Sequence, residues 1–255
     1  MNIAIVTGAS SGIGREFVKK LSKNEEFDQI WIIARRRERL LELELKYGEK
    51  IVPIELDLTN MDELQKFEDM LKDKNVNVKM LVNCAGFGKF GKFDIIPMAD
   101  KMNMIDLNCK ALVYITEAVV PFMQKGAKII EVDSIAAFQP LPLINVYGAT
   151  KAFVLNYTIA MQEELRDKGI RIYALCPGWT RTEFFETAES ETKEINTFGK
   201  WFTADEIVSY ALKKIKKTKK VVLTPSLINK LQHGAAKLLP TKATLAVWLK
   251  LQKKK

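Results

Sequence analysis

The chain has 255 residues, of which 47% are hydrophobic, with 40 basic and 31 acidic side chains. This length suits a single α/β domain, and no run of eighteen apolar residues exists, so we expect no membrane-spanning helix. The first apolar run begins at residue 3, which predicts that no signal peptide is present. The three cysteines are scattered and odd in number, which favours reduced thiols and a cytoplasmic location. A single histidine, His233, interpreted as a helix-surface residue, and the lack of a cysteine cluster with ligand spacing predict no metal site.

Strand-like and helical runs alternate along most of the chain. Alternation of this kind predicts parallel strands joined by crossover helices that cover both faces of the sheet. We therefore expect one α/β domain with a doubly wound parallel sheet over residues 1–224, followed by a basic helical extension of that domain over residues 225–255. The predicted strands are residues 3–7, 29–34, 51–56, 79–83, 127–133, 170–175 and 220–224.

A glycine-rich turn follows the first strand. Residues 7–14 read T-G-A-S-S-G-I-G, and Phe17, Val18 and Leu21 then follow at helical spacing. In a strand–turn–helix unit, glycines let the backbone approach a pyrophosphate, and the helix N-terminus offers free N–H groups. The spacing is G-x-x-x-G-x-G, which differs from the commoner G-x-G-x-x-G. A tight connection without a ligand is the alternative, but the flanking strand and helix favour a dinucleotide site.

The residues after the second strand concern the choice of dinucleotide. An acid about twenty residues past the glycines usually holds the ribose 2′-hydroxyl of NAD. The strand instead ends at Ala34, and Arg35, Arg36 and Arg37 follow. Because a guanidinium suits a 2′-phosphate, this pattern predicts NADP. We interpret Arg37 and Arg39 as the solvated basic start of the next helix.

Tyr147 and Lys151 form the most distinctive pair, with Ser134 thirteen positions before the tyrosine. Residues four apart share one face of a helix, so the phenol and the ammonium are expected to lie side by side. The ammonium should then lower the pKa of the phenol toward neutrality. Such a phenol could exchange a proton with a carbonyl or alcohol oxygen that Ser134 also hydrogen-bonds. The alternative is a core tyrosine beside a surface lysine.

With these motifs, the chain resembles the short-chain dehydrogenase/reductase family over about residues 1–222. Residues 7–14 are similar to its T-G-x-x-x-G-x-G cofactor motif, and N-C-A-G at residues 83–86 is similar to its N-N-A-G turn. P-G-W-T-R-T at residues 177–182 is similar to the P-G-x-x-x-T segment that covers the nicotinamide. The resemblance implies a Rossmann-like fold and a catalytic tetrad of Asn108, Ser134, Tyr147 and Lys151.

The same resemblance implies individual roles and an oligomer. Lys151 would also hold the nicotinamide ribose, Asn108 would place a water in a proton relay, and Asp57 would contact the adenine. Family helices that match residues 98–124 and 145–168 pair between subunits, so we expect a homodimer or homotetramer. The implied NADP-binding residues are Gly8, Ser10, Ser11, Gly12, Ile13, Gly14, Arg35, Arg36, Asp57, Leu58, Asn83, Ala85, Gly86, Tyr147, Lys151, Pro177, Gly178, Thr180 and Thr182.

Two features depart from the family pattern. Glu131 and Asp133 precede Ser134 where more neutral residues are usual, and Asp133 is either a solvated turn residue or a bias on the local field. The glycine-rich V-D-G-G turn that closes many members is absent, so the substrates of the best-known members cannot be transferred to this chain.

The basic excess lies at the C-terminal end. Residues 205–255 hold 13 lysines and 2 acids, a net charge of +11, whereas residues 1–204 hold 27 basic and 29 acidic residues, a net charge of −2. Three interpretations remain open: a solvated exterior with apolar faces docked on the body or on a partner subunit, an amphipathic tail on an anionic membrane, or attraction of a phosphorylated substrate. Few aromatics occur there, so nucleic acid is not expected. The apolar stripe is Leu227, Ile228, Leu231, Leu238 and Leu239, with Pro240 ending that helix and Leu245, Trp248 and Leu249 suggesting another.

Aromatic residues near the site motifs bear on the substrate. If they face the site, the substrate is largely apolar: a fatty acyl ketone, a steroid or another lipid-like carbonyl. They could also be core anchors. We therefore expect an NADP(H)-dependent oxidoreductase that interconverts a carbonyl and an alcohol, the alternative being a catalytically silent NADP-binding regulatory or membrane-surface protein. The residues concerned are Phe138, Leu141, Leu143, Phe184, Phe185, Phe198, Trp201 and Phe202.

Overall fold

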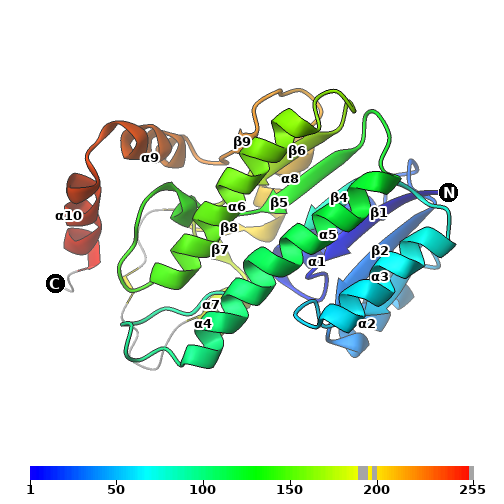
Figure 1. The fold of residues 1–255 in the computed structure, drawn as a ribbon, viewed down its shortest axis with the longest axis horizontal. Coiled ribbons are helices and arrows are strands. Elements are labelled where there is room, and N and C mark those ends of the chain that lie inside the picture. The colour runs from blue at the N-terminus through cyan, green and yellow to red at the C-terminus, as the bar shows by residue number, and fades with distance from the viewer. Residues whose placement is uncertain (189–194, 197–199, 253–255) are drawn as a thin grey trace.

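The centre of the molecule is a seven-stranded parallel sheet with the strand order β3-β2-β1-β4-β5-β6-β9 (Figure 1). The structure is a computed structural model that describes residues 1–188, 195–196 and 200–252. Every predicted strand is present, although the last is shorter than expected. The strands are β1 (Asn2–Thr7), β2 (Gln29–Ala34), β3 (Ile51–Glu55), β4 (Asn77–Asn83), β5 (Lys128–Val132), β6 (Arg171–Leu175) and β9 (Val222–Leu223).

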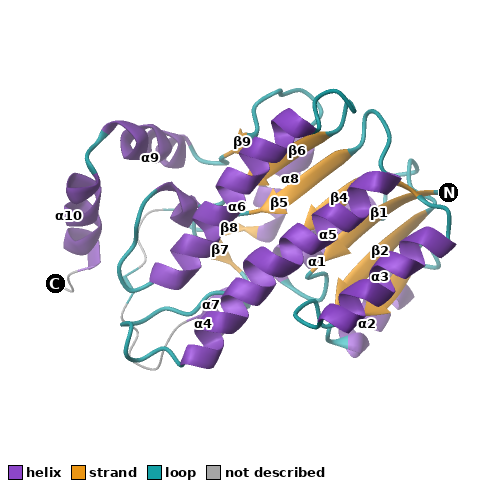
Figure 2. Ribbon diagram, in the orientation of Figure 1, coloured by secondary structure: helices purple, strands orange, loops and turns teal. Residues whose placement is uncertain are grey.

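Helices cover both faces of this sheet (Figure 2), which confirms the doubly wound, Rossmann-like fold. The two helices that follow β9 confirm the C-terminal helical extension. None of the described helices is long and apolar enough to cross a bilayer. The helices are α1 (Gly12–Leu21), α2 (Arg37–Tyr47), α3 (Met61–Asp73), α4 (Met98–Ile105), α5 (Leu112–Val119), α6 (Asn145–Glu164), α7 (Phe184–Ala188), α8 (Ala204–Lys214), α9 (Leu227–Leu238) and α10 (Thr241–Gln252).

Short elements join these helices and strands. The expected long helix over residues 98–124 is divided, because the π-helical turn η1 (Asp106–Ala111) separates α4 from α5 and the 3₁₀ turn η2 (Val120–Phe122) ends it. A second 3₁₀ turn, η3 (Ile135–Phe138), follows β5. The short strands β7 (Thr180–Arg181) and β8 (Phe202–Thr203), which the sequence pattern did not indicate, pair in parallel.

Two hydrophobic layers form the core. Ile3 and Ile5 of β1 pack with α3, α5 and α6 on one face of the sheet, and Ala4 and Val6 pack with α1, α2 and α8 on the other. Successive strand residues point to opposite faces, and both faces are covered. This is why the strands are continuous apolar runs rather than alternating ones.

The strand order reverses between β1 and β4, and this reversal positions the site. β2 and β3 lie on one side of β1, whereas β4, β5, β6 and β9 lie on the other. Crossover helices therefore leave in opposite directions at this point and open a crevice beyond the carboxyl ends of the strands, where ligands bind in open α/β sheets.

The helices α9 and α10 lie at the end of the molecule opposite the N-terminus (Figure 1). Trp248 of α10 is buried, and its Nε1 donates to the carbonyl oxygen of Pro142 at 2.9 Å. His233 of α9 stacks on Phe138 with ring centroids 4.1 Å apart. His233 is thus half-buried rather than a surface residue, and the extension packs on the body of the domain.

Candidate active site

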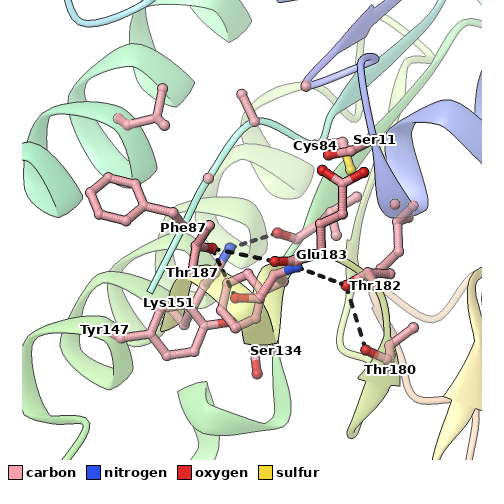
Figure 3. A pocket seen from close by; sticks show the side chains of 18 of the residues that line it. Ser11, Cys84, Phe87, Ser134, Tyr147, Lys151, Thr180, Thr182, Glu183 and Thr187 are labelled. Atoms are coloured by element: carbon pink, nitrogen blue, oxygen red, sulfur yellow. Dashed lines mark hydrogen bonds between the residues drawn. The ribbon is translucent and has the colours of Figure 1, made fainter. Parts of the chain in front are cut away.

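A cavity of about 780 Å³ opens at the carboxyl ends of the strands (Figure 3). The glycine turn after β1, the ends of β2 and β4, the loops after β5 and β6, and helices α6, α7, α9 and α10 all contribute to its lining. Every site residue that the sequence predicts lines this cavity except Gly14, Asn83 and Asn108. The structure therefore brings both predicted groups, the cofactor cradle and the tyrosine–lysine pair, to one place.

The glycine turn disfavours a side chain at each of its three glycine positions. Gly8 and Gly12 have φ angles of +64° and +52°, which L side chains rarely adopt. A Cβ on Gly14 would lie 2.3 Å from the Gly8 carbonyl oxygen, which explains why Gly14 supports the turn without lining the cavity.

The N-terminus of α1 is open toward the cavity. Ser11 is the N-cap residue of α1 and lines the cavity, yet its side chain makes no capping hydrogen bond. The first turn of the helix contains no acid. Free N–H groups and the positive end of the helix dipole suit the pyrophosphate of a dinucleotide.

The loop after β6 lies across from the glycine turn, as Figure 3 shows for Thr180 and Thr182. A Cβ on Gly12 would lie 3.2 Å from the Cβ of Thr182. The N-terminal end of this loop is held by a hydrogen bond in which the Pro177 carbonyl accepts the Ile135 N–H at 3.1 Å. The P-G-W-T-R-T segment therefore forms the wall opposite α1.

The first arginine after β2 is exposed and close to an acid. Arg35 lines the cavity, and its Nη1 lies 3.9 Å from Oδ2 of Asp57. Asp57 itself accepts hydrogen bonds from the N–H and the hydroxyl of Thr59, at 2.9 and 2.7 Å. Arg37 pairs with Glu55 at 3.5 Å on the surface, in agreement with its expected solvated position.

An unpredicted acid, Glu183, joins two other arginines. Arg36 donates from Nε and Nη2 to Ser10 Oγ at 3.2 and 3.0 Å, and from Nη1 to Glu183 at 3.0 Å. Arg39 donates to both Glu183 oxygens at 2.6 and 2.7 Å, so its interpretation as a solvated residue is wrong. Burial raises the pKa of Glu183, but the two guanidinium groups have a larger effect in the opposite direction. The pKa of Glu183 is therefore below its ordinary value. The sequence signal that could have identified Glu183 is its position directly after the P-G-x-x-x-T segment.

Asn108 lies in the π-helical turn η1 and faces the backbone rather than the cavity. Its Oδ1 accepts the Phe87 N–H at 3.0 Å, and its Nδ2 donates to the Phe87 carbonyl at 2.9 Å and to Thr150 Oγ1 at 3.1 Å. Asn108 thus fixes the chain after β4 to α6, which carries the tyrosine and lysine.

Tyr147 and Lys151 are both buried on α6, as the spacing predicts. Lys151 Nζ donates to the Val132 carbonyl at 2.8 Å and lies 5.8 Å from the centre of the Tyr147 ring. Burial raises the pKa of Tyr147, while Lys151 and Ser134 act in the opposite direction and Asp133 raises it further. The expected shift toward neutrality is wrong, because desolvation outweighs the ammonium.

Comparison with known proteins identifies the family to which this arrangement of motifs belongs. The family model described as short chain dehydrogenase matches residues 2–193. The chain belongs to the short-chain dehydrogenase/reductase family. It is an oxidoreductase of that family, and its fold and motif order agree with this assignment.

Individual members of the family are similar to this dehydrogenase. Sulfoacetaldehyde reductase 2 of Chromohalobacter salexigens is 35% identical over 192 residues, which cover 72% of this chain and 74% of that protein. The NADP-dependent 3-hydroxy acid dehydrogenase YdfG of Escherichia coli is 32% identical over 179 residues, with coverage of 69% and 71%. A short-chain dehydrogenase from Sphingobium yanoikuyae in complex with NADPH has a TM-score of 0.78 at 26% identity, with coverage of 94% and 97%.

Two carboxyl groups are buried at the end of β5 in this dehydrogenase, one on the strand and one directly after it. Glu131 is fully buried and accepts hydrogen bonds from Asn83 Nδ2 at 3.2 Å and Thr116 Oγ1 at 3.0 Å. Burial raises its pKa to about 8, although Thr116, Asn83 and Lys151 act in the opposite direction. Asn83 thus bonds core groups, which explains why it does not line the cavity.

Asp133 is the second of these carboxyls. It is 3% exposed, so the interpretation as a solvated turn residue is wrong. Its Oδ2 accepts a hydrogen bond from Cys176 Sγ at 3.5 Å, and its Oδ1 is buried without a partner. Burial raises the pKa of Asp133 to about 7, and Lys151 opposes this shift. The ammonium of Lys151 therefore acts on two buried carboxyls as well as on the phenol.

Aromatic side chains form one wall of the cavity beside Tyr147, whose ring lies 5.5 Å from that of Phe184 and 6.1 Å from that of Phe90. Of the aromatic and apolar residues that the sequence singles out, Leu141, Phe184 and Phe185 line the cavity. Phe202 packs in the core as an anchor, and Phe198 lies outside the described residues. The lining also contains Phe87, Phe90, Trp179 and Trp248, which sequence reasoning missed.

The buried carboxyls predict an unusual pH dependence of stability. Because Glu131 holds its proton in the folded protein up to about pH 8 but releases it near pH 4.5 when unfolded, the folded state binds more protons between these values. The free energy of unfolding should then fall as pH rises through this window, by about 1.4 kcal/mol per unit of pKa difference.

Denaturant unfolding from pH 5 to pH 9 measures this effect. Glu131→Gln should lose part of the fall and gain stability relative to the wild type as pH rises. The matched control is Glu164→Gln, at an exposed position at the end of α6, which should keep the wild-type slope. Parallel pH profiles for the wild type and Glu131→Gln would contradict the assignment.

Proposed function

We propose that this protein is an NADP(H)-dependent oxidoreductase that interconverts a carbonyl and an alcohol on a largely apolar substrate. The observation that carries the proposal is the shared cavity. The glycine turn and the α1 N-terminus lie at one side of it, and Ser134, Tyr147 and Lys151 lie at the other.

The residues present suit NADP. The glycine positions of the turn disfavour side chains, the α1 N-terminus suits a pyrophosphate, and Arg35 and Arg36 line the same cavity, which supports their proposed role as partners of a 2′-phosphate. The Escherichia coli relative is named as NADP-dependent, and the Sphingobium structure contains NADPH, which supports the same choice. The chemistry that a bound nicotinamide dinucleotide supplies is the transfer of a hydride to or from the substrate carbon.

The proposed tetrad handles the proton. Tyr147 donates its phenolic proton to the substrate oxygen during reduction and takes a proton back from the alcohol during oxidation. Ser134 hydrogen-bonds the same oxygen, and Lys151 stabilises the phenolate that reduction leaves. Because burial raises the pKa of Tyr147, the phenol is protonated at neutral pH and is ready to act as an acid. Asn108 acts indirectly, since it fixes the Phe87 backbone.

An apolar substrate is proposed from the cavity lining. Phe90, Phe184, Phe185 and Trp248 surround the space next to Tyr147. By their names, the two curated relatives act on small polar substrates, sulfoacetaldehyde and 3-hydroxy acids. The aromatic wall favours a larger, lipid-like ketone here, such as a fatty acyl ketone or a steroid.

The three free cysteines agree with the proposed cytoplasmic location.

We predict that Tyr147→Phe abolishes turnover and leaves NADP binding nearly intact. The ring remains and only the proton donor is lost, so kcat should fall by at least about 10²–10⁴-fold. NADPH oxidation against a panel of ketones, steroids and acyl thioesters, with calorimetry for binding, measures both effects. Tyr157→Phe on the same helix is the control, because the Tyr157 hydroxyl bonds Glu117 outside the cavity. NADP binding by the wild type without turnover on any substrate would instead support the catalytically silent alternative.

The cofactor preference should depend on Arg35. We expect the wild type to prefer NADPH over NADH, and Arg35→Ala to reduce that preference by about ten- to a hundredfold in kcat/KM, as expected for a charged hydrogen bond. Arg37→Ala is the matched control, since Arg37 pairs with Glu55 on the surface. Equal use of both cofactors by the wild type would count against NADP.

We also propose a homodimer or homotetramer that assembles through α4 and α6. Met98 and Met102 of α4 and Phe153 of α6 are large apolar residues exposed on the surface. Light scattering should give a mass of two or four chains, and Met102→Glu with Phe153→Glu should reduce it. Leu45→Glu on α2, which is also exposed, should not. A monomeric wild type at micromolar concentration would exclude this assembly.

A further inference from the structure

The helix α9 exposes its apolar side to solvent. Leu227, Ile228, Leu231 and Leu238 are 71%, 70%, 67% and 86% exposed, and α9 contains no buried residue. At 3.6 residues per turn, these four side chains fall within an arc of about 100°. We call these four residues the α9 face.

The polar side of α9 contacts the body of the protein instead. Gln232 lines the cavity, His233 stacks on Phe138, and Asn229 Nδ2 lies 2.7 Å from the position that a Cβ on Gly178 would take. A helix on the surface of a globular protein normally turns its apolar stripe toward the core. In α9 this orientation is inverted, so the packing of the domain does not account for the leucines.

The C-terminal segment that contains α9 carries only positive charges. From residue 207 to the end of the chain there are 13 lysines and no aspartate or glutamate. Lys230 and Lys237 of α9 fall beside the α9 face, about 60–80° around the helix from Leu227. The run at residues 213–220 and Lys242 and Lys250 of α10 add further positive charge. An apolar face bordered by lysines is the pattern of a helix that lies in a membrane interface.

We propose that the α9 face docks on the surface of an anionic lipid bilayer. The leucines and isoleucine would enter the boundary between headgroups and acyl chains, and the lysines would contact the anionic headgroups. A second copy of the chain fits this face less well. A two-fold contact would bring one lysine-rich, acid-free segment against another, and like charges in an interface are unfavourable.

Docking would also place the membrane beside the cavity. Gln232 on the inner side of α9 and Trp248 of α10 both line the cavity, so the extension that meets the lipid is part of the cavity wall. An apolar substrate could then enter from the bilayer. This consequence rests on the proposed function, whereas the docking itself does not.

Vesicle co-sedimentation of the full-length protein tests the proposal without any assay of activity. The wild type should bind vesicles of phosphatidylcholine that contain about one-third phosphatidylglycerol, and should not bind pure phosphatidylcholine vesicles. Binding should fade near 1 M salt, where the Debye length is about 3 Å. Failure to bind the anionic vesicles at low salt would overturn the proposal.

Two double variants separate the contributions. Leu231→Gln with Leu238→Gln should weaken vesicle binding at least about tenfold, and Lys230→Gln with Lys237→Gln should weaken it about fivefold per lysine. Leu45→Gln, at an equally exposed leucine on α2, is the matched control and should bind as the wild type does. Circular dichroism and NADP binding confirm that each variant is folded.

Two other outcomes would overturn the proposal. If the leucine variant binds vesicles as the wild type does, the basic segment attracts lipid without the α9 face. If the same variant dissociates an oligomer in light scattering and leaves vesicle binding unchanged, the α9 face is a contact between subunits.

Discussion

The contact between the carboxyl ends of β1 and β4 is the constraint on which the site depends. The hydroxyl of Thr7 accepts the N–H groups of Cys84 and Ala85 at 3.0 and 3.1 Å, and a Cβ on Gly8 would lie 2.7 Å from the Ala85 nitrogen. This contact fixes the glycine turn against the chain that follows β4. Asn108 then ties that chain to α6, so that the glycine turn and the tyrosine–lysine pair are held in fixed positions relative to one another.

One ammonium acts on several buried acids. Lys151 is held by the Val132 carbonyl at the end of β5, and it lowers the pKa of the two carboxyls that flank Val132 in the chain, Glu131 and Asp133. Each buried carboxyl has one oxygen without a hydrogen-bond partner, a costly arrangement that keeps its pKa high. The pKa of Tyr147 therefore depends on Asp133, directly after β5, as well as on the lysine beside it. Asp133 is one of the positions at which the chain departs from the neutral residues of the family pattern.

The cavity also connects parts of the chain that are far apart in sequence. Glu183, just after the loop that follows β6, bonds Arg36 and Arg39 near the end of β2, so the wall over the proposed nicotinamide site is tied to the proposed phosphate site. Trp248 of α10 also lines the cavity and donates a hydrogen bond to the Pro142 carbonyl. The C-terminal extension is thus both a wall of the cavity and the carrier of the exposed α9 face.

The sequence determined the positions of the strands along the chain, the glycine turn, the position of Tyr147 beside Lys151 and the presence of two C-terminal helices, because each depends on the local spacing of apolar residues, glycines or proline. The tertiary structure decided the rest. The Glu183–Arg36–Arg39 contact and the burial of Asp133 depend on how separate loops and strands meet, and no local pattern records that. The helical spacing of the apolar residues revealed the stripe on α9, but spacing alone does not show which side of the helix packs against the body of the protein. Only the packing of Gln232 and His233 showed that the stripe faces outward, since orientation is set by the partner surface and not by the helix itself.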